Sequence, residues 1–401
     1  MRILMVHNHY KSRGGEDIVF EQECSMLESN GHEVIKLYAN NDNINSLFSK
    51  MVTALGVIHS FRGCSSVREK IKIHQPDAMH VHNFFPKFSP AIFNVAHQLG
   101  VPTILTLHDF RIVCPSTSLL VNGKIDERSL KGNPFLMVSE RVYKGSWFGT
   151  LVLASMIQYH KTRGTWLNDV DCFVALTEFN KLKFIQAGLD VDKISVKPNF
   201  LINSDKLSGQ TSLERHRRGA LYVGRITEEK GLMTLLDAWR GIDYPLTIIG
   251  DGDIEKFQEY ATENVIFLGE VSRDEVEKYM KLSLFLVLPS EVYEGFPMSL
   301  CEAYFSGLPV IASDLGSLKE LIDEGKTGLK FKPEDSQQLR TAVKYLISYP
   351  EKALSMGRHA LDLANAQYTE KLNYKITMDI YESAISRFDT VQDLQGGKVI
   401  C

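Results

Sequence analysis

The segment LSLFLVLPSEVYEGFPMSLCEAYFSGLPVIAS (282–313) has the pattern of a strand, a loop, a helix and a second strand. Its first and last apolar runs are short and continuous, as is typical of buried parallel strands. Gly295 and Pro297 favour a loop that turns into a helix, and residues 298–305 have the composition of that helix. A strand, helix, strand order of this kind predicts an α/β fold with a parallel sheet.

The same alternation continues through most of the chain, so we expect parallel sheets covered by helices on both faces. A chain of 401 residues exceeds what one hydrophobic core usually holds, and the polar segment 199–219 has the composition of a linker. We therefore expect two doubly wound α/β domains, residues 1–200 and residues 201–370. The expected strands are residues 2–8, 33–39, 78–83, 102–108, 172–177 and 193–198 in the first half, and 220–226, 245–251, 265–271, 282–290 and 308–313 in the second.

The end of the chain predicts one further helix, residues 371–391. Five apolar residues recur there every four positions and leave one apolar stripe to bury: Leu372, Ile376, Ile380, Ala384 and Phe388. The spacing alone does not decide whether this helix completes the second domain or returns to the first.

The composition excludes several classes of protein. A net charge of −4 gives no general attraction to nucleic acid, so we expect no nucleic-acid partner. The six cysteines form no C-x-x-C pair, which favours free thiols in a reducing compartment over a zinc site. Neither a signal peptide nor a membrane-spanning run is recognisable, and we expect a cytoplasmic protein.

Charged residues follow several of the expected strands, where ligands of open α/β sheets bind. Glu294 precedes the helix 298–305, and Glu302 lies inside it. Arg225 and Lys230 follow the strand 220–226 closely and could hold a diphosphate. Each of these side chains could instead be an ordinary solvated surface charge.

The first domain offers two comparable features. Gly14 and Gly15 precede an expected helix, where glycine lets the backbone approach a phosphate, although a simple turn explains these two glycines better when they are taken alone. His108 follows the strand 102–108 at its carboxyl end, although an isolated histidine is often structural. His80 and His82 share one face of a strand, but no third ligand stands at a suitable spacing, so we expect no metal site.

Taken together, these motifs resemble retaining glycosyltransferases of family four with the GT-B fold. The resemblance covers residues 1 to about 390 and rests on RGGED (13–17), PDAMHVHN (76–83), TLHD (106–109), GRITEEKG (224–231) and EGFPMSLCE (294–302). It implies two Rossmann-like domains facing a cleft, with the acceptor bound mainly by the first and the nucleotide-sugar by the second. It also implies that the last helix crosses back to the first domain.

The resemblance further implies a role for each motif residue. Glu294 would bond the hydroxyls of the donor sugar, Glu302 the ribose, and His108 would lie near the anomeric carbon. Arg225 and Lys230 would bind the diphosphate. The remaining donor-binding residues would meet the phosphates through their backbone: Gly14 and Gly15 in the first domain, and Phe296, Pro297, Met298 and Ser299 in the second.

The two cations suggest a reaction without a metal ion. Negative charge develops on the leaving diphosphate, and a unit charge at about 4 Å contributes roughly 4 kcal/mol at an effective dielectric of about 20, or on the order of a thousandfold in rate. We therefore expect no cofactor. Front-face attack would retain the anomeric configuration, and Glu294 as a covalent nucleophile is the alternative.

Two basic, apolar stretches suggest contact with an anionic membrane surface and hence a lipid-linked saccharide acceptor. The first runs from residue 47 to residue 72 and the second from residue 131 to residue 166. Both could equally be ordinary helices with solvated faces. The apolar and basic members are Leu47, Met51, Leu55, Ile58, Phe61, Arg62, Arg68, Lys70 and Lys72 in the first, and Lys131, Arg141, Lys144, Trp147, Phe148, Leu151, Leu153, Lys161 and Arg163 in the second.

The sequence therefore predicts a glycosyltransferase that uses a nucleotide-diphosphate sugar, of which a UDP-sugar is our first expectation, in polysaccharide assembly such as O-antigen or capsule. A nucleotide-sugar 2-epimerase of the same fold and a non-catalytic sugar-nucleotide binding protein are the alternatives. Neither the sugar, the nucleotide base, the acceptor nor the oligomeric state follows from these patterns.

Overall fold

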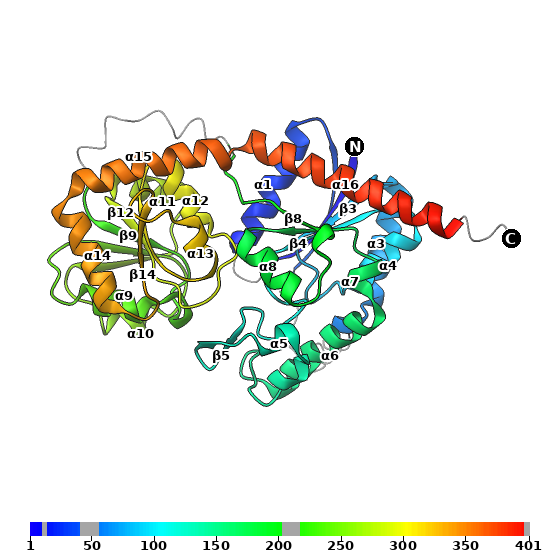
Figure 1. Cartoon of the computed structure of the whole chain (residues 1–401), viewed down its shortest axis with the longest axis horizontal. Helices are drawn as coiled ribbons and strands as arrows, with labels where there is room; N and C mark the ends of the chain where they lie inside the picture. Colours follow the sequence, from blue (N-terminus) through cyan, green and yellow to red (C-terminus); the bar gives the residue numbers. More distant parts are fainter. Residues whose placement is uncertain (10–13, 41–55, 203–216, 397–401) are drawn as a thin grey trace. The chain divides into compact units, whose positions relative to one another are not determined.

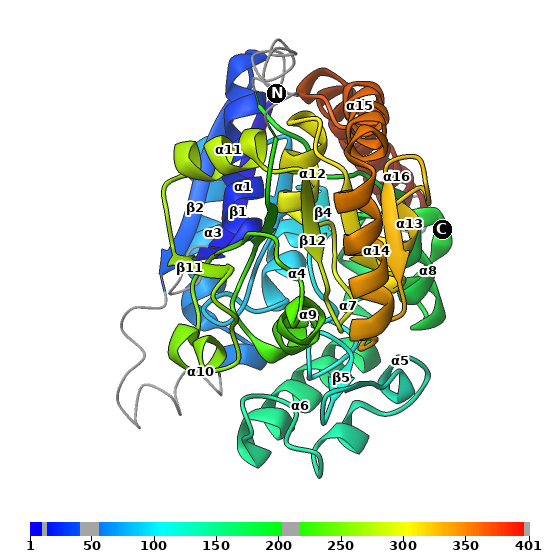
Figure 2. The same cartoon turned by 90° about the vertical axis from the view of Figure 1, so that its left-hand side faces the viewer.

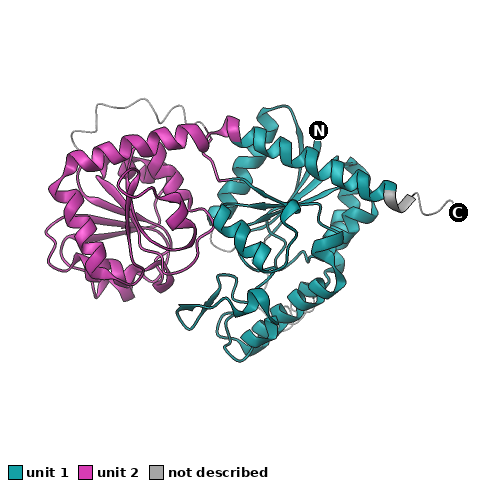
Figure 3. Cartoon of the chain, viewed as in Figure 1, with its two compact units in different colours: residues 1–197, 373–401 teal, residues 198–372 magenta. Residues whose placement is uncertain are grey.

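The computed structural model describes residues 1–9, 14–40, 56–202 and 217–396. The predicted Leu47, Met51 and Leu55, and most of the expected linker, lie outside these residues. The chain forms two compact units (Figure 3): unit 1 is Met1–Lys197 with Asn373–Cys401, and unit 2 is Pro198–Leu372.

Unit 1 contains a six-stranded parallel sheet with the strand order β2-β1-β3-β4-β7-β8. Its core strands are short and entirely buried, as the continuous apolar runs predict. A small hairpin, β5 with β6, lies apart from the sheet. The strands are β1 (Arg2–His9), β2 (Glu33–Asn40), β3 (Ala78–Val81), β4 (Thr103–Leu107), β5 (Leu120–Val121), β6 (Lys124–Ile125), β7 (Cys172–Ala175) and β8 (Ile194–Val196).

Helices cover both faces of this sheet. Helices α1 and α16 share one face, where Phe20 and Leu27 pack with Tyr381 and Ala384 in one buried cluster; both lie above the sheet in Figure 1. The helices of unit 1 are α1 (Gly15–Ser29), α3 (Phe61–His74), α4 (Ala91–Gln98), α5 (Arg128–Lys131), α6 (Trp147–Arg163), α7 (Thr165–Asn168) and α8 (Glu178–Gln186), with 3₁₀ turns at Pro134–Met137 and Val191–Lys193, and α16 (Glu370–Gly396) joins it from residue 373.

Helix α16 buries the later part of the predicted stripe, but the buried face is shifted at the start of the helix. Ile380, Ala384 and Phe388 are buried, but Leu372 is only half-buried and the polar Asn373 is 2% exposed. A spacing of four residues drifts around a helix that has 3.6 residues per turn. At the start of α16 the buried position is therefore Asn373, one residue after the predicted Leu372.

Unit 2 contains a second six-stranded parallel sheet, in the order β11-β10-β9-β12-β13-β14. This is the strand order of a Rossmann fold. The strand β14 was not predicted. The strands are β9 (Ala220–Val223), β10 (Leu246–Ile249), β11 (Val265–Gly269), β12 (Phe285–Leu288), β13 (Val310–Ser313) and β14 (Gly328–Phe331).

The helices of unit 2 also cover both faces. In Figures 1 and 2, α11, α12 and α15 lie above the sheet and α9 and α10 lie below it. The predicted α/β fold with two doubly wound parallel sheets is confirmed. The helices are α9 (Leu232–Trp239), α10 (Ile254–Gln258), α11 (Arg273–Leu282), α12 (Met298–Phe305), α13 (Gly316–Leu321), α14 (Ser336–Ser348) and α15 (Pro350–Gln367), with a 3₁₀ turn at Glu228–Lys230.

Candidate active site

The strand order of each sheet reverses direction at one point, and the candidate residues gather there. In unit 2 the reversal lies between β9 and β12, whose carboxyl ends precede Arg225 and Glu294. In unit 1 it lies between β1 and β3, whose carboxyl ends precede Gly14 and His82. Ligands of open α/β sheets bind at such switch points.

In unit 2, Lys230 and Glu294 form an ion pair. The Lys230 ammonium donates to both carboxylate oxygens of Glu294 at 2.7 and 2.8 Å, and the Ser290 hydroxyl also donates to Glu294. Burial alone raises the pKa of Glu294, but the Lys230 ammonium, the Ser290 hydroxyl and Arg225 together leave this pKa below its usual value. The structure thus brings together a fixed cation and an ionised carboxylate.

A glycine makes this pair possible. Gly231 has φ +73°, and a Cβ at that position would lie 1.9 Å from the carbonyl oxygen of Pro289. Only glycine lets the turn that carries Lys230 come this close to the end of β12. The backbone N–H of Glu291 donates to the Glu229 carbonyl at 3.0 Å and ties the two loops together.

Arg225 lies apart from this pair. Its guanidinium is 67% exposed and contacts the Glu229 carboxylate at 3.3 Å. The structure therefore leaves Arg225 accessible to a ligand, while its backbone is fixed by the Tyr222 hydroxyl, which donates to the Arg225 carbonyl at 2.6 Å.

The loop before α12 is held on several sides. The Asn199 amide donates to the Phe296 carbonyl at 2.9 Å, and the Ser317 hydroxyl donates to the Glu294 carbonyl at 2.9 Å. The ring of Phe296 also meets Tyr368 edge-on, with centroids 5.0 Å apart. A loop fixed in this way presents its atoms to a ligand without a further ordering cost.

Helix α12 begins at Met298 after Pro297, which provides no side-chain cap. The first N–H groups of a helix lack partners within the helix and favour an anion. Met298 and Ser299 are the first two residues of this turn, so their N–H groups are in the position expected for phosphate contacts. Glu302 follows one turn later, and burial raises the pKa of its carboxyl to about 7.

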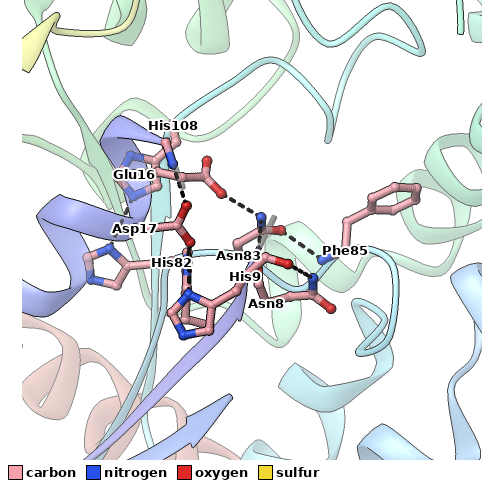
Figure 4. Close-up of polar contacts among 10 residues, drawn as sticks. Asn8, His9, Glu16, Asp17, His82, Asn83, Phe85 and His108 are labelled. Atoms are coloured by element: carbon pink, nitrogen blue, oxygen red, sulfur yellow. Dashed lines mark hydrogen bonds and ion pairs between the residues drawn. The ribbon is translucent and has the colours of Figure 1, made fainter. Parts of the chain in front are cut away.

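In unit 1, the start of α1 is organised by Asp17. Its carboxylate accepts from the Gly14 N–H at 2.8 Å and lies 2.7 Å from His7 Nε2 and 2.9 Å from His9 Nδ1; Figure 4 shows the His9 contact. Gly15 is exposed and is the first residue of the helix. The two glycines therefore start a helix whose first turn is fixed to β1.

The carboxyl ends of β3 and β4 add Asn83 and His108. Asn83 donates to the carboxyl group of Glu16 at 2.5 Å, and His82 Nδ1 lies 3.1 Å from His108 Nε2 (Figure 4). Burial and the nearby Asp109 raise the pKa of Glu16 to about 8. Burial, with His82 next, lowers the pKa of His108 well below its usual value, so His108 is a neutral imidazole near pH 7.

Two clusters in the described part of the chain have the ligand types and spacing of a metal site: His7, His9 and Asp17, and Glu23, His80 and His82. The second corrects our statement that His80 and His82 lack a third ligand, because Glu23 comes from α1, far away in the sequence. Its groups are engaged, however. Glu23 binds the Lys197 ammonium, and His80 contacts Tyr381 and Thr106 through its two ring nitrogens.

The sequence-based reasoning did not assign several side chains that complete these arrangements: Ser290, Asn199, Ser317, Glu16, Asp17, Glu23, Asn83 and Lys197. A partial signal exists for Glu23. It stands among the apolar residues of α1, and both Glu23 and its neighbours on that face are buried.

The basic stretches of unit 1 expose large apolar side chains. Trp147 and Phe148, at the start of α6, are 53% and 54% exposed, and Phe61, at the start of α3, is 81% exposed. The neighbouring cations Lys131, Arg141 and Lys144 are exposed as well. Among the described residues, no helix is both long and apolar enough to span a membrane.

Several solved structures have this architecture. The structure of Anabaena HepE in complex with UDP superimposes with a TM-score of 0.66 at 15% identity, covering 95% of this chain and all of that one. Sucrose-phosphate synthase from Thermosynechococcus elongatus gives 0.69 at 18% identity, covering 99% of each chain. The fold is therefore that of the GT-B class.

Family models give a narrower assignment. Residues 13–201 match Glycosyltransferase Family 4, and residues 203–362 match Glycosyl transferases group 1. The chain belongs to the family-four glycosyltransferases with the GT-B fold.

Curated relatives agree with this assignment. D-rhamnosyltransferase WbpZ of Pseudomonas aeruginosa is 37% identical over 147 residues, which are 35% of this chain and 39% of the relative. A 41.2 kDa protein in the cps region of Klebsiella pneumoniae is 32% identical over 42% of this chain and half of its own length. The chain thus matches half or less of the length of these two relatives, whereas a glycosyltransferase of Methanocaldococcus jannaschii, MJ1178, is 25% identical over 92% of this chain and 95% of its own.

Proposed function

We propose that this chain transfers a sugar, with retention of its anomeric configuration, from a nucleotide-diphosphate sugar to a lipid-linked saccharide during polysaccharide assembly. The observation that carries the proposal is the Lys230–Glu294 pair at the switch point of unit 2, in which Glu294 belongs to the loop that leads into α12. A cation and helix N–H groups suit a diphosphate, and a carboxylate suits the hydroxyls of a sugar, so this pair supports a nucleotide-sugar site.

A UDP-sugar is the donor that we test first. HepE has been solved with UDP and with UDP-glucose, and Glu302 offers a carboxyl group to a ribose from the inside of α12. Thermal-shift measurements against UDP-, GDP- and ADP-sugars compare the bases directly. Stabilisation by none of the three would contradict a nucleotide-sugar donor.

The relatives and the surface of unit 1 support a lipid-linked saccharide as the acceptor. WbpZ is a rhamnosyltransferase and the Klebsiella protein lies in a cps region, and exposed Trp147 and Phe148 stand beside cations, as suits an anionic bilayer. The assay is transfer of labelled sugar to lipid-linked saccharides in extracted membranes, with the anomeric configuration of the product read by NMR. Conversion of the donor when no acceptor is present would instead favour a 2-epimerase, and binding without turnover a non-catalytic protein.

The proposed reaction uses the side chains of this chain in place of a metal ion. Lys230 and Arg225 would stabilise the leaving diphosphate, Glu294 would orient the donor sugar, and His108 would contact the sugar near the reacting carbon. In this scheme the departing phosphate oxygen takes the proton of the acceptor. Loss of activity in EDTA that magnesium restores would refute the metal-independent reaction, and a glycosylated Glu294 peptide would show the covalent alternative.

A further inference from the structure

Four side chains of unit 1 form a continuous row that ends at His108. Lys197 follows β8 and binds Glu23 of α1; the second oxygen of Glu23 lies 3.4 Å from His82 Nε2, and His82 Nδ1 lies 3.1 Å from His108 Nε2. The first three side chains are 1–3% exposed, whereas His108 is half-buried at the carboxyl edge of the sheet. The row therefore connects a sealed ion pair with a partly exposed histidine.

The atoms of Glu23 and His82 that face each other are Oε2 and Nε2. Both are buried, and neither has a hydrogen-bond partner among the described residues. Each is therefore the nearest available partner of the other. Burial alone raises the pKa of Glu23, but Lys197 and the imidazoles hold it well below its usual value, so this carboxyl group is ionised.

An ionised carboxylate can only accept, so His82 must present N–H at Nε2. In a singly protonated imidazole the lone pair then lies on Nδ1, and that atom can only accept as well. His108 Nε2, which faces it, must carry the proton of the His108 ring. The remaining ring nitrogen of His108, Nδ1, keeps its lone pair and can accept a hydrogen bond from a hydroxyl group.

We propose that Lys197 and Glu23 are positioning residues that act through His82 to hold His108 in the Nε2–H tautomer, so that Nδ1 accepts a hydrogen bond from a hydroxyl of the reacting sugar. The role in the reaction rests on the proposed function, whereas the tautomer is a property of the free protein. The arrangement resembles a carboxylate that orients a catalytic histidine, with one more imidazole between them.

A single substitution tests whether Glu23 determines the tautomer of His108. In Glu23→Gln, an amide whose oxygen accepts from Lys197 turns its NH₂ group toward His82, so His82 Nε2 must accept and Nδ1 must donate. His108 Nε2 then accepts, and its proton moves to Nδ1. We therefore expect Glu23→Gln to exchange the tautomer of His108 without removing any ring.

The measurement is a two-bond ¹H–¹⁵N correlation spectrum of protein labelled with ¹⁵N-histidine, with the His108 signals assigned by their loss in His108→Asn. We expect protonated Nε2 in the wild type and protonated Nδ1 in Glu23→Gln. The exposed Glu21 on the same helix provides the control, since Glu21→Gln should leave the spectrum of His108 unchanged. A wild-type His108 that is protonated at Nδ1, a doubly protonated His82, or an unchanged tautomer in Glu23→Gln would overturn the proposal.

Glu23→Gln leaves the Lys197 charge buried without its carboxylate and could impair folding. The double variant Glu23→Gln/Lys197→Met removes both charges and leaves no uncompensated ion. With no lysine to orient the amide, the double variant should show a mixture of His108 tautomers. A pure Nε2–H form in the folded double variant would show that the ion pair does not set the tautomer.

Kinetics separate this role from a purely structural one. Loss of one hydrogen bond to the sugar should lower kcat about 10- to 100-fold in Glu23→Gln, with little change in the KM for the donor. The double variant should lose less, because its mixture of tautomers keeps a fraction of His108 with an accepting Nδ1. The NMR experiment needs neither donor nor turnover, so it stands even if the chain transfers no sugar. A changed tautomer with an unchanged kcat would refute the positioning role while leaving the proposed function intact.

Discussion

Neutralising Lys230 should affect stability and catalysis in different ways. Its ammonium lies 2.7 and 2.8 Å from the Glu294 oxygens, and the two side chains are 18% and 15% exposed. Unit charges at about 3 Å interact by roughly 5 kcal/mol at an effective dielectric of about 20, and partial exposure reduces this value. We expect Lys230→Met to lower the free energy of unfolding by roughly 2 to 4 kcal/mol, because it leaves a carboxylate without its cation.

The double variant Lys230→Met/Glu294→Gln removes both charges and should recover at least half of that loss. Its activity should not recover, because the diphosphate and the sugar both lose a partner, and kcat should stay on the order of a thousandfold below wild type. Urea denaturation gives the stability cycle, and labelled-sugar transfer gives kcat. Additive losses of stability, or near-normal turnover in Lys230→Met, would refute this reasoning.

The pH dependence of stability in the same variants tests the direction of the Glu294 pKa shift. The folded-state pKa of Glu294 is lowered, so the stabilisation from the pair is present above the unfolded-state pKa and is lost as the pH falls through the folded-state value. Lys230→Met should therefore differ most from wild type near neutral pH, and the difference should shrink in acid as Glu294 is protonated. A difference that grows in acid would contradict the pairing.

Three further changes test other parts of the site and surface. Gly231→Ala should lower the free energy of unfolding by roughly 2 kcal/mol or more and lower activity, because its Cβ would meet the Pro289 carbonyl at 1.9 Å. Denaturation and transfer assays measure the two effects. A neutral effect on both would be inconsistent with the close approach. Glu302→Gln should raise Tm at about pH 8 but not at about pH 5. Burial raises the pKa of Glu302 to about 7, so ionisation of this carboxyl group lowers the stability of the wild type as the pH rises. Equal Tm shifts at both pH values would count against this prediction. Trp147→Ser/Phe148→Ser should reduce pelleting with anionic liposomes at low salt, and full retention would place any membrane contact elsewhere.

The sheets were largely predictable because each buried parallel strand is a continuous apolar run bounded by turn residues. Strand β14 was missed for a physical reason. It begins at Gly328, where a Cβ would lie 1.9 Å from the Val310 carbonyl oxygen, so the strand can pair only if it starts with glycine. The same glycine, in the sequence KTGLKF (326–331), is a turn signal when read alone.

The candidate site was predictable only in part. Charges at the carboxyl ends of strands can be found from the sequence, because parallel strands end at one edge of the sheet. The pairing of Glu23 with Lys197 could not, because the two are 174 residues apart and neither residue alone indicates its partner. Asn373 is likewise a buried polar residue whose partner is distant in the sequence. Its Oδ1 lies 3.4 Å from the Lys197 Nζ and gives the ammonium another acceptor.

The two ion pairs differ in whether a ligand can reach them, and this difference can be measured. Lys230 and Glu294 remain 18% and 15% exposed, so an arriving diphosphate can share the ammonium, whereas the Lys197 and Glu23 side chains are each 2% exposed and can act only through their neighbours. Salt screens accessible charges far more than sealed ones, with a Debye length of about 3 Å at 1 M. We therefore expect the double-mutant coupling energy of Lys230 with Glu294 to fall clearly between low salt and about 1 M salt, while that of Lys197 with Glu23 stays nearly constant. Equal salt sensitivity of the two couplings would mean that water reaches both pairs, and the distinction between a binding pair and a positioning pair would then fail.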